Sequence, residues 1–413
     1  MVLIGIFSAI GVVQLERAGS IPDWLQQSPW LYDGDVTGAR TLLGVVASSM
    51  IAVAGTVFSI TIAALSLAAG QMGPRLLRNF TKDRGNQITF GFFLGTFAYA
   101  LMVLRSVRED AFVPHLSLTI AILLAFVCVA MLVWFVAHMA GRINVDTVID
   151  LVSTDVHDAV QRLTTKAESP DPPPDAFWRD AAVIEDPRYG YLQELDAEGL
   201  ADWAAANDTA IRLLARPGHY IFPGAPVALV TPPRDDAKDA VTRMTALGQA
   251  RMSSADLEFA VRQLEEVAVR ALSSGINDPH TAINVLDRMG TALCQLVPLR
   301  LPTGAYKRNG RTVLVVPDFD YDGLTDSMFH MIRQNAAHVP AVLIRILEIL
   351  TAVASCEKDS GRLDTLQRHA NLVLATAARS VSSASDRADV RARHEDFMIM
   401  RSKGVLGFAC AED

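Results

Sequence analysis

The feature that most limits the fold is a run of 28 residues without a charged side chain, from Leu42 to Ala69. A membrane-spanning helix needs ~20 consecutive, mostly apolar residues. Two further runs approach or meet that length, with 17 residues from Ile88 to Leu104 and 22 residues from Leu116 to Ala137. We therefore predict three membrane-spanning helices in the first third of the chain.

A shorter apolar segment, Val2 to Leu15, lies at the start of the sequence. It lacks the basic residues and the small-residue cleavage site of a signal peptide. We predict that it is the end of a fourth span whose first part precedes residue 1, which gives spans at about 1–15, 42–69, 88–104 and 116–137. The alternative is a short segment that lies in the membrane interface.

The loop between the second and third spans is the most basic loop of the membrane half. Because short cytoplasmic loops are rich in Lys and Arg, this loop is predicted to be cytoplasmic, and with four spans so are both termini. The basic residues alternate with apolar ones, as in segments that bind the membrane surface. The candidates for contacts with lipid headgroups are Arg75, Arg78, Lys82 and Arg84. The alternative is a simple topology anchor.

The long span 42–69 has small and hydroxylated residues at helical spacing along one face. The candidate residues of this face are Ser49, Thr56, Ser59 and Ser66, with Ala52, Ala63 and Gly70 in the same row. Such residues let membrane helices approach closely, so helix packing is one interpretation. The wall of a pore in a homo-oligomer is the other. No Asp, Glu, Lys or Arg lies inside the clear spans, which disfavours an ion-coupled pump.

The rest of the chain is rich in charge and is predicted to be a cytoplasmic, mainly α-helical domain that contains a small α+β module. The transmembrane domain covers residues 1–140, a connecting helix occupies 141–168, and Ser169–Pro174 is a proline-rich break. Strand-like alternation and Pro-Gly turns between residues 182 and 232 indicate the α+β module. Helical periodicity dominates from 235 to 403, with one strand at Arg311–Val316 and a frayed tail from residue 404.

A polar turn separates two of the predicted helices of this domain. Gly275 suits the end of the first helix, and Asp278 with Pro279 suits the beginning of the second. The turn gathers polar groups beside a helix N-terminus, where an anion or another polar ligand can bind. The candidate ligand-binding residues are Ser273, Ser274, Gly275, Asn277, Asp278 and His280. The alternative is a capped helix–turn–helix without a ligand.

The composition argues against several classes of function. The formal net charge is -8 and there is no basic block, which disfavours nucleic-acid binding. The four cysteines include no CxxC pair, and the nine histidines show no tight metal-ligand spacing along the sequence. The sequence contains no nucleotide-binding, hydrolase or kinase motif. We predict no enzyme activity, catalytic residue, cofactor or metal site.

Three stretches of the chain carry a resemblance to one family. They are the loop Gly73–Gln87, the following Gly91–Phe97 and the segment Arg270–Ala282. Together they are similar to the predicted bacterial membrane proteins of domain-of-unknown-function family 2254, over nearly the whole chain. Ser274 stands where that family has proline, and the family has a longer N-terminal span. The resemblance implies a bacterial inner (plasma) membrane protein and no known activity, catalytic residue or cofactor.

These observations predict a homo-oligomeric channel or permease-like protein in the lipid bilayer, regulated by its cytoplasmic domain. The alternative is a membrane-anchored sensor or scaffold, which would bind a polar ligand or a partner through the 273–280 turn or the 182–232 module. A membrane enzyme that acts on lipid has only the basic loop in its favour.

Overall fold

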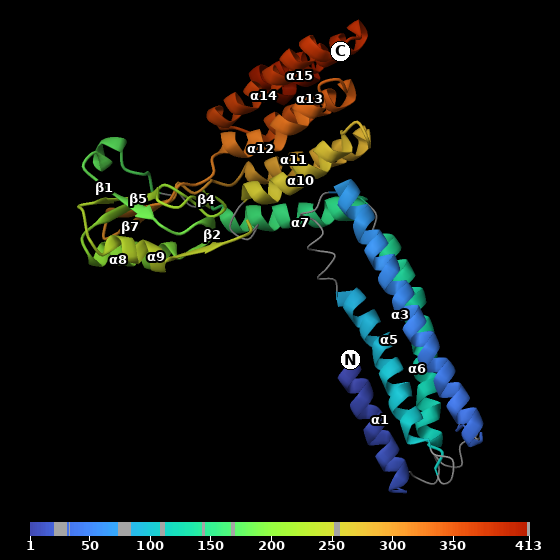
Figure 1. Cartoon of the computed structure of the whole chain (residues 1–413). Helices are drawn as coiled ribbons and strands as arrows, with labels where there is room; N and C mark the ends of the chain where they lie inside the picture. Colours follow the sequence, from blue (N-terminus) through green and yellow to red (C-terminus); the bar gives the residue numbers. More distant parts are fainter. Residues whose placement is uncertain are drawn as a thin grey trace. The chain divides into compact units, whose positions relative to one another are not determined.

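The computed structural model describes residues 1–19, 31–32, 34–72, 84–107, 112–142, 145–166, 170–251 and 257–410. The chain divides into two compact units, residues 1–147 and residues 148–413. The first is a helical bundle, and the second combines two small sheets with a stack of helices (Figure 1). Each unit is described by itself.

The bundle of the first unit consists of helices that follow the apolar runs of the sequence. They are α1 (Val2–Arg17), α3 (Val36–Met72), α5 (Arg84–Ser106) and α6 (His115–Arg142). Among the described residues, three segments are long and apolar enough to cross a membrane: Val36–Ser66, Arg84–Ser106 and His115–Gly141. The three predicted spans are confirmed as such helices. Helix α1 has 16 residues, which is a length of about 24 Å against a hydrocarbon core of ~30 Å.

Helix α1 packs on α5 through glycines. A Cβ atom on Gly5 would lie 2.3 Å from the backbone oxygen of Gly95, and one on Gly91 would lie 2.5 Å from the side chain of Met1. The two helices therefore approach closely enough that only hydrogen fits between them at Gly5. Close packing of this kind is typical of membrane helices with small residues spaced four apart, such as Gly91 and Gly95.

The far end of α1 is tied to α6 by a carboxylate. Glu16 accepts hydrogen bonds from the backbone N–H groups of Leu116 at 2.7 Å and Ser117 at 3.1 Å. These are free donors of the first turn of α6, where the helix dipole also favours negative charge. Helix α1 is thus an integral part of the bundle, whichever way it meets the membrane.

The second unit contains two small, mostly antiparallel sheets. The five-stranded sheet has the order β1 (Ala182–Asp186), β5 (Ala225–Thr231), β3 (Ala210–Leu213), β8 (Arg311–Val315) and β7 (Ala305–Arg308). The three-stranded sheet has the order β4 (Tyr220–Ile221), β2 (Gly190–Leu195) and β6 (Thr245–Gly248). Helices α8 (Ala197–Ala206) and α9 (Ala237–Arg243) and the short 3-10 helix η1 (Asp175–Trp178) accompany them.

The sheets recruit residues beyond the predicted module 182–232. Strand β8 confirms the predicted strand near Arg311, but it pairs in parallel with β3, about a hundred residues earlier. Strand β6 lies where only helix was predicted, because its residues pair with β2, as in Leu192 with Leu247. The pairing of both strands depends on partners far away in the chain, and local periodicity does not indicate which strands pair.

The remaining helices form the stack at the end of the second unit (Figure 1). They are α7 (Val145–Leu163), α10 (Leu257–Ala271), α11 (Pro279–Leu296), α12 (Tyr321–Asn335), α13 (Pro340–Cys356), α14 (Ser360–Ser380) and α15 (Ala384–Ala409). Helix α12 packs against α10 and α14, and α13 packs against α11 and α15. The predicted fraying after residue 403 is wrong, since α15 resumes after a break at Gly404 (φ 67°) and ends at Ala409. Whether α6 continues into α7 depends on residues 143–144, which lie outside the described residues.

Candidate functional site

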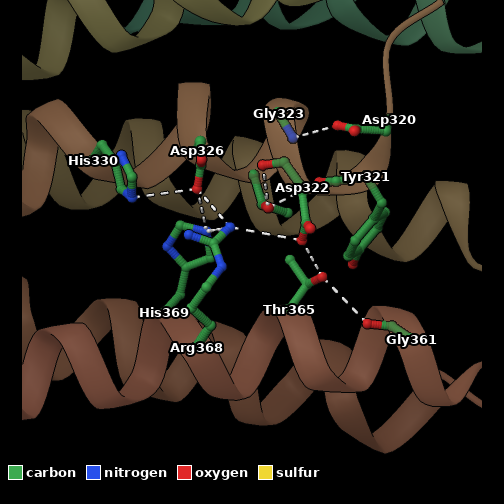
Figure 2. A network of polar contacts seen from close by, with 11 residues as sticks. Asp320, Tyr321, Asp322, Gly323, Asp326, His330, Gly361, Thr365, Arg368 and His369 are labelled. Atoms are coloured by element: carbon green, nitrogen blue, oxygen red, sulfur yellow. Dashed lines mark hydrogen bonds and ion pairs between the residues drawn. The ribbon is translucent and has the colours of Figure 1, made fainter.

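The candidate site is a seam of polar side chains between α12 and α14. Asp322 on α12 accepts a hydrogen bond from Thr365 on α14, and Arg333 donates one to Thr376 at 2.7 Å. Both pairs are 43 residues apart in the chain, and Asp326 faces His369 with the same offset. The two helices therefore run parallel and in register along the seam. Figure 2 shows the first two of these pairs, Asp322 with Thr365 and Asp326 with His369.

Capping residues fix where both helices begin. The carboxylate of Asp320 accepts the N–H of Gly323 at 2.6 Å, and that of Asp359 accepts the N–H of Arg362 at 2.9 Å. Helical spacing then places Asp322, Asp326 and His330 one turn apart along α12. The opposite side of α12 is buried in the core of the unit through Leu324, Met328 and Ile332.

One carboxylate oxygen lies at the centre of the seam. Oδ1 of Asp326 is 2.7 Å from Nη2 of Arg368, 3.1 Å from Nε2 of His369 and 3.2 Å from Nε2 of His330 (Figure 2). Three nitrogens thus converge on one oxygen, which has two lone pairs to offer. Within the described part of the chain, Nε2 of His330 has no hydrogen-bond partner despite its approach to Oδ1, and neither has Nδ1 of His369.

The surroundings differ between the two histidines. His369 is 1% exposed and packs against the ring of Phe329, with ring centroids 5.4 Å apart. Burial and, to a smaller extent, the nearby Arg368 charge lower the pKa of His369 to about 4, against the opposing effect of Asp326. The ring is therefore neutral at neutral pH. The side chains of Asp326 and His330 are 37% and 34% exposed, although Nε2 of His330 itself is buried.

A second carboxylate and a guanidinium complete the arrangement. Nη2 of Arg368 lies 3.6 Å from Oδ1 of Asp322, in addition to its contact with Asp326. Arg368 is therefore shared between two acceptors on successive turns of α12. The site can hold charge of either sign, because it contains two acids, one exposed guanidinium and a neutral imidazole.

The turn that the sequence analysis singled out is a self-contained cap. Asp278 caps α11 and binds the N–H of Thr281 at 3.2 Å and its hydroxyl at 2.7 Å, with Pro279 in the first turn, as predicted. These hydrogen bonds lower the pKa of Asp278. Ser273 donates to the backbone oxygen of Arg270. Gly275, which we predicted at the end of the first helix, lies beyond the end of α10 at Ala271, and the residue of this turn with a positive φ is Asn277 (φ 50°).

The remaining candidates of the turn, Ser274, Gly275, Asn277 and His280, are exposed. The turn lies between α10 and α11, whereas the seam lies between α12 and α14. A role of the turn in ligand binding stays a prediction.

The small-residue face of α3 points away from its own bundle. Thr56, Ser59 and Ser66 are exposed and Ser49 is half-buried. Thr56 and Ser59 donate to the backbone oxygens of Ala52 and Gly55, four residues earlier. Their hydroxyls are thereby satisfied inside the helix, which makes them tolerable in lipid. A pore-lining or packing role of this face stays a prediction.

The basic loop of the membrane half is only partly visible. Arg75, Arg78 and Lys82 lie outside the described residues, and Arg84 is exposed at the beginning of α5. Contacts of these residues with lipid headgroups stay a prediction.

The sequence analysis missed the grouping of Asp326, His330 and His369. The spacing of Asp326 and His330 by four residues was a usable signal, because it places both side chains on one face of a helix. His369 could not be added to them, since it is 39 residues further along the chain and on another helix. Only the packing of α12 on α14 brings it to the same point.

Comparison with known proteins gives a family and relatives. A family of predicted membrane proteins, domain of unknown function 2254, matches residues 1–352. Uncharacterized proteins of Mycobacterium tuberculosis and Mycobacterium bovis are 32% identical to the chain over 396 residues, which covers 91% of this chain and 74% of each relative. No solved structure matches the chain. The matched stretch includes Asp326 and His330 and ends before His369.

Proposed function

Because the chain belongs to family 2254 of predicted membrane proteins, we propose that it is a membrane-anchored sensor whose soluble unit binds a small polar or ionic ligand at the α12–α14 seam. The observation that carries this proposal is the convergence of three nitrogens on Oδ1 of Asp326 at a place that solvent reaches. A purely structural salt bridge needs one donor per acceptor. Here three nitrogens crowd one carboxylate oxygen and Nε2 of His330 is left without a hydrogen-bond partner, so the group has a polar atom free for a ligand.

The test is thermal unfolding of the full chain in nanodiscs with four probes added separately: ZnCl2, MgCl2, inorganic phosphate and malonate. The proposal predicts that at least one probe raises the unfolding temperature of the wild type and leaves that of Asp326→Asn unchanged. Asp278→Ala serves as the comparison, because it alters the other candidate site. The proposal is overturned if no probe has an effect, or if Asp278→Ala abolishes the effect while Asp326→Asn retains it.

A homo-oligomeric channel is the second candidate function. It is supported by the outward face of α3, where Gly44 and Gly55 border open space and Thr56 and Ser59 are exposed. Large exposed apolar residues, such as Ile51 and Phe58 on α3 and Leu123 and Phe126 on α6, suit contact with lipid. Small faces of this kind favour close contact between membrane helices of neighbouring copies. Ion flux into liposomes that contain the purified protein supports the channel, and tight liposomes with every probe named above contradict it.

The topology that we propose has four spans, with α1 as the fourth, and both termini in the cytoplasm of a bacterium. The support is the Lys/Arg-rich loop and the integration of α1 into the bundle. Cys410 is an exposed thiol near the C-terminus, and Cys356 is the other exposed one. In a Cys356→Ser background, an impermeant maleimide should label Cys410 in inside-out vesicles and not in intact cells. Labelling in intact cells would reverse the topology.

A further inference from the structure

We propose that Asp326, His330 and His369 together bind a divalent transition-metal ion between α12 and α14. This rests on the proposed function, because it names the ligand class of the same site. Among the described residues, these three offer ligand atoms that all lie within 4.8 Å of one another. Two imidazoles and one carboxylate are a common ligand set for Zn²⁺ and for non-haem Fe²⁺.

The distances already fit a metal's coordination sphere. Metal–nitrogen and metal–oxygen bonds of about 2.0–2.2 Å place two ligands of a tetrahedral ion ~3.3 Å apart. Nε2 of His369 and Nε2 of His330 lie 3.1 Å and 3.2 Å from Oδ1 of Asp326. Two edges of the ligand triangle therefore need no rearrangement beyond a few tenths of an ångström. The unpartnered Nε2 of His330 is the atom that a metal would satisfy.

The carboxylate of Asp326 supplies an anionic ligand beside the two imidazoles, and a second carboxylate, Asp322, lies one turn away on α12. The facing positive groups are Arg368, which contacts Asp326, and Arg333 further along the seam, which is bound to Thr376. Arg368 has a second acceptor in Asp322. It can keep that contact when a metal ion takes its place at Asp326.

The ligand types and their exposure narrow the class of ion. Mg²⁺ and Ca²⁺ prefer oxygen ligands, so a site with two imidazoles selects Zn²⁺-like ions against them. Three protein ligands leave at least one coordination position for water or a second ligand, unlike the closed four-ligand sites that only hold a fold together. The half-exposed Asp326 and His330 give the ion a route in and out. These are the properties of an exchangeable site.

Direct binding tests this inference on the full chain in detergent. Isothermal titration with ZnCl2 should give one tight site per chain, and Co²⁺ should show the intense visible absorption of a four- or five-coordinate ion with nitrogen ligands. Asp326→Asn and His330→Gln should each weaken binding by at least about tenfold. Because His369 is buried, its replacement could unfold the unit, and the half-exposed His330 is the safer variant. His338→Gln is the matched control, since His338 is exposed and bonds to the backbone of Ser380 instead.

The outcomes separate the metal site from the sensor role. The metal site would be overturned if the wild type and His330→Gln bind Zn²⁺ equally. It would also be overturned if Co²⁺ keeps the weak spectrum of its hexaaqua ion. Phosphate or malonate could then still stabilise the protein through Asp326, and the sensor would stand without a metal. If neither Zn²⁺ nor any of the other probes binds or stabilises the wild type, both the metal site and the sensor are overturned.

Discussion

At the scale of single residues, Glu265 on α10 is the carboxyl group with the most unusual environment outside the membrane bundle and the seam. Desolvation raises its pKa to about 7, against the opposing effects of the Arg262 charge and of a hydrogen bond from the backbone of Met331. A carboxyl whose pKa is higher in the folded state binds its proton more tightly there than in the unfolded chain. Folding stability therefore decreases as the pH rises from about 4.5 through 7.

Replacing Glu265 with Gln should remove this pH dependence. We expect Glu265→Gln to match the wild type near pH 5 and to exceed it by about 1 kcal/mol at pH 8, a figure reduced from the full linkage value because the group is partly solvated. Thermal unfolding of the full chain at the two pH values measures the difference. A gap between variant and wild type that is the same at pH 5 and pH 8 would refute the assignment.

Also at this scale, the sequence predicts a contact when both partners are near in the chain. The cap of Asp278 on Thr281 spans three residues and was predicted. The contact of Asp326 with His369 depends on how two helices pack, and no local pattern specifies that. The positive φ at Asn277 was not predicted, because Asn adopts that conformation only in some of its positions and the local sequence does not say which.

At the scale of elements, the crossing of α1 and α5 depends on a single missing side chain. A Cβ on Gly5 would meet the backbone oxygen of Gly95 at 2.3 Å, and a backbone atom cannot swing aside as a flexible side chain can. Gly11, two turns further along the same helix, has nothing within 4 Å of its would-be Cβ. The two glycines thus form a matched pair on one helix.

Alanine at these two positions should have opposite effects. We expect Gly5→Ala to destabilise the bundle by about 1–3 kcal/mol, because the helices must separate. Gly11→Ala should be neutral or stabilising by up to about 1 kcal/mol, because alanine favours helix. Thermal unfolding of the detergent-solubilised protein gives the comparison. Equal effects of the two substitutions would mean that α1 does not pack on α5 at Gly5.

Helices were easier to predict from the sequence than strands in this chain. Each of the helices from α10 to α14 carries its own apolar periodicity, so its existence is a local property. Strands β6 and β8 belong to sheets through partners far away in the chain. The four residues of β6 have no periodicity long enough to distinguish them from the helical surroundings.

At the scale of the whole molecule, we propose that copies of the chain associate through the outward face of α3. Within one copy, Gly55 borders open space. If a second copy packs there, a bulky residue at this position should push the two copies apart. We expect Gly55→Leu to shift the protein from oligomer to monomer in subunit counting by single-molecule photobleaching. Ala130→Leu, an exposed position on α6, should leave the oligomer intact. A wild type that is already monomeric, or equal behaviour of both variants, would argue against this interface and against the channel.

If a ligand binds at the α12–α14 seam of this membrane protein, it should hold the two helices together. Hydrogen–deuterium exchange of the full chain in nanodiscs, with and without ZnCl2, tests it most directly, because exchange reports local opening of each helix. We expect Zn²⁺ to slow exchange in α12 and α14 of the wild type and of His338→Gln, and to have no effect there in Asp326→Asn. Identical exchange of both helices in the presence and absence of Zn²⁺, under conditions where the protein is folded, would contradict the account.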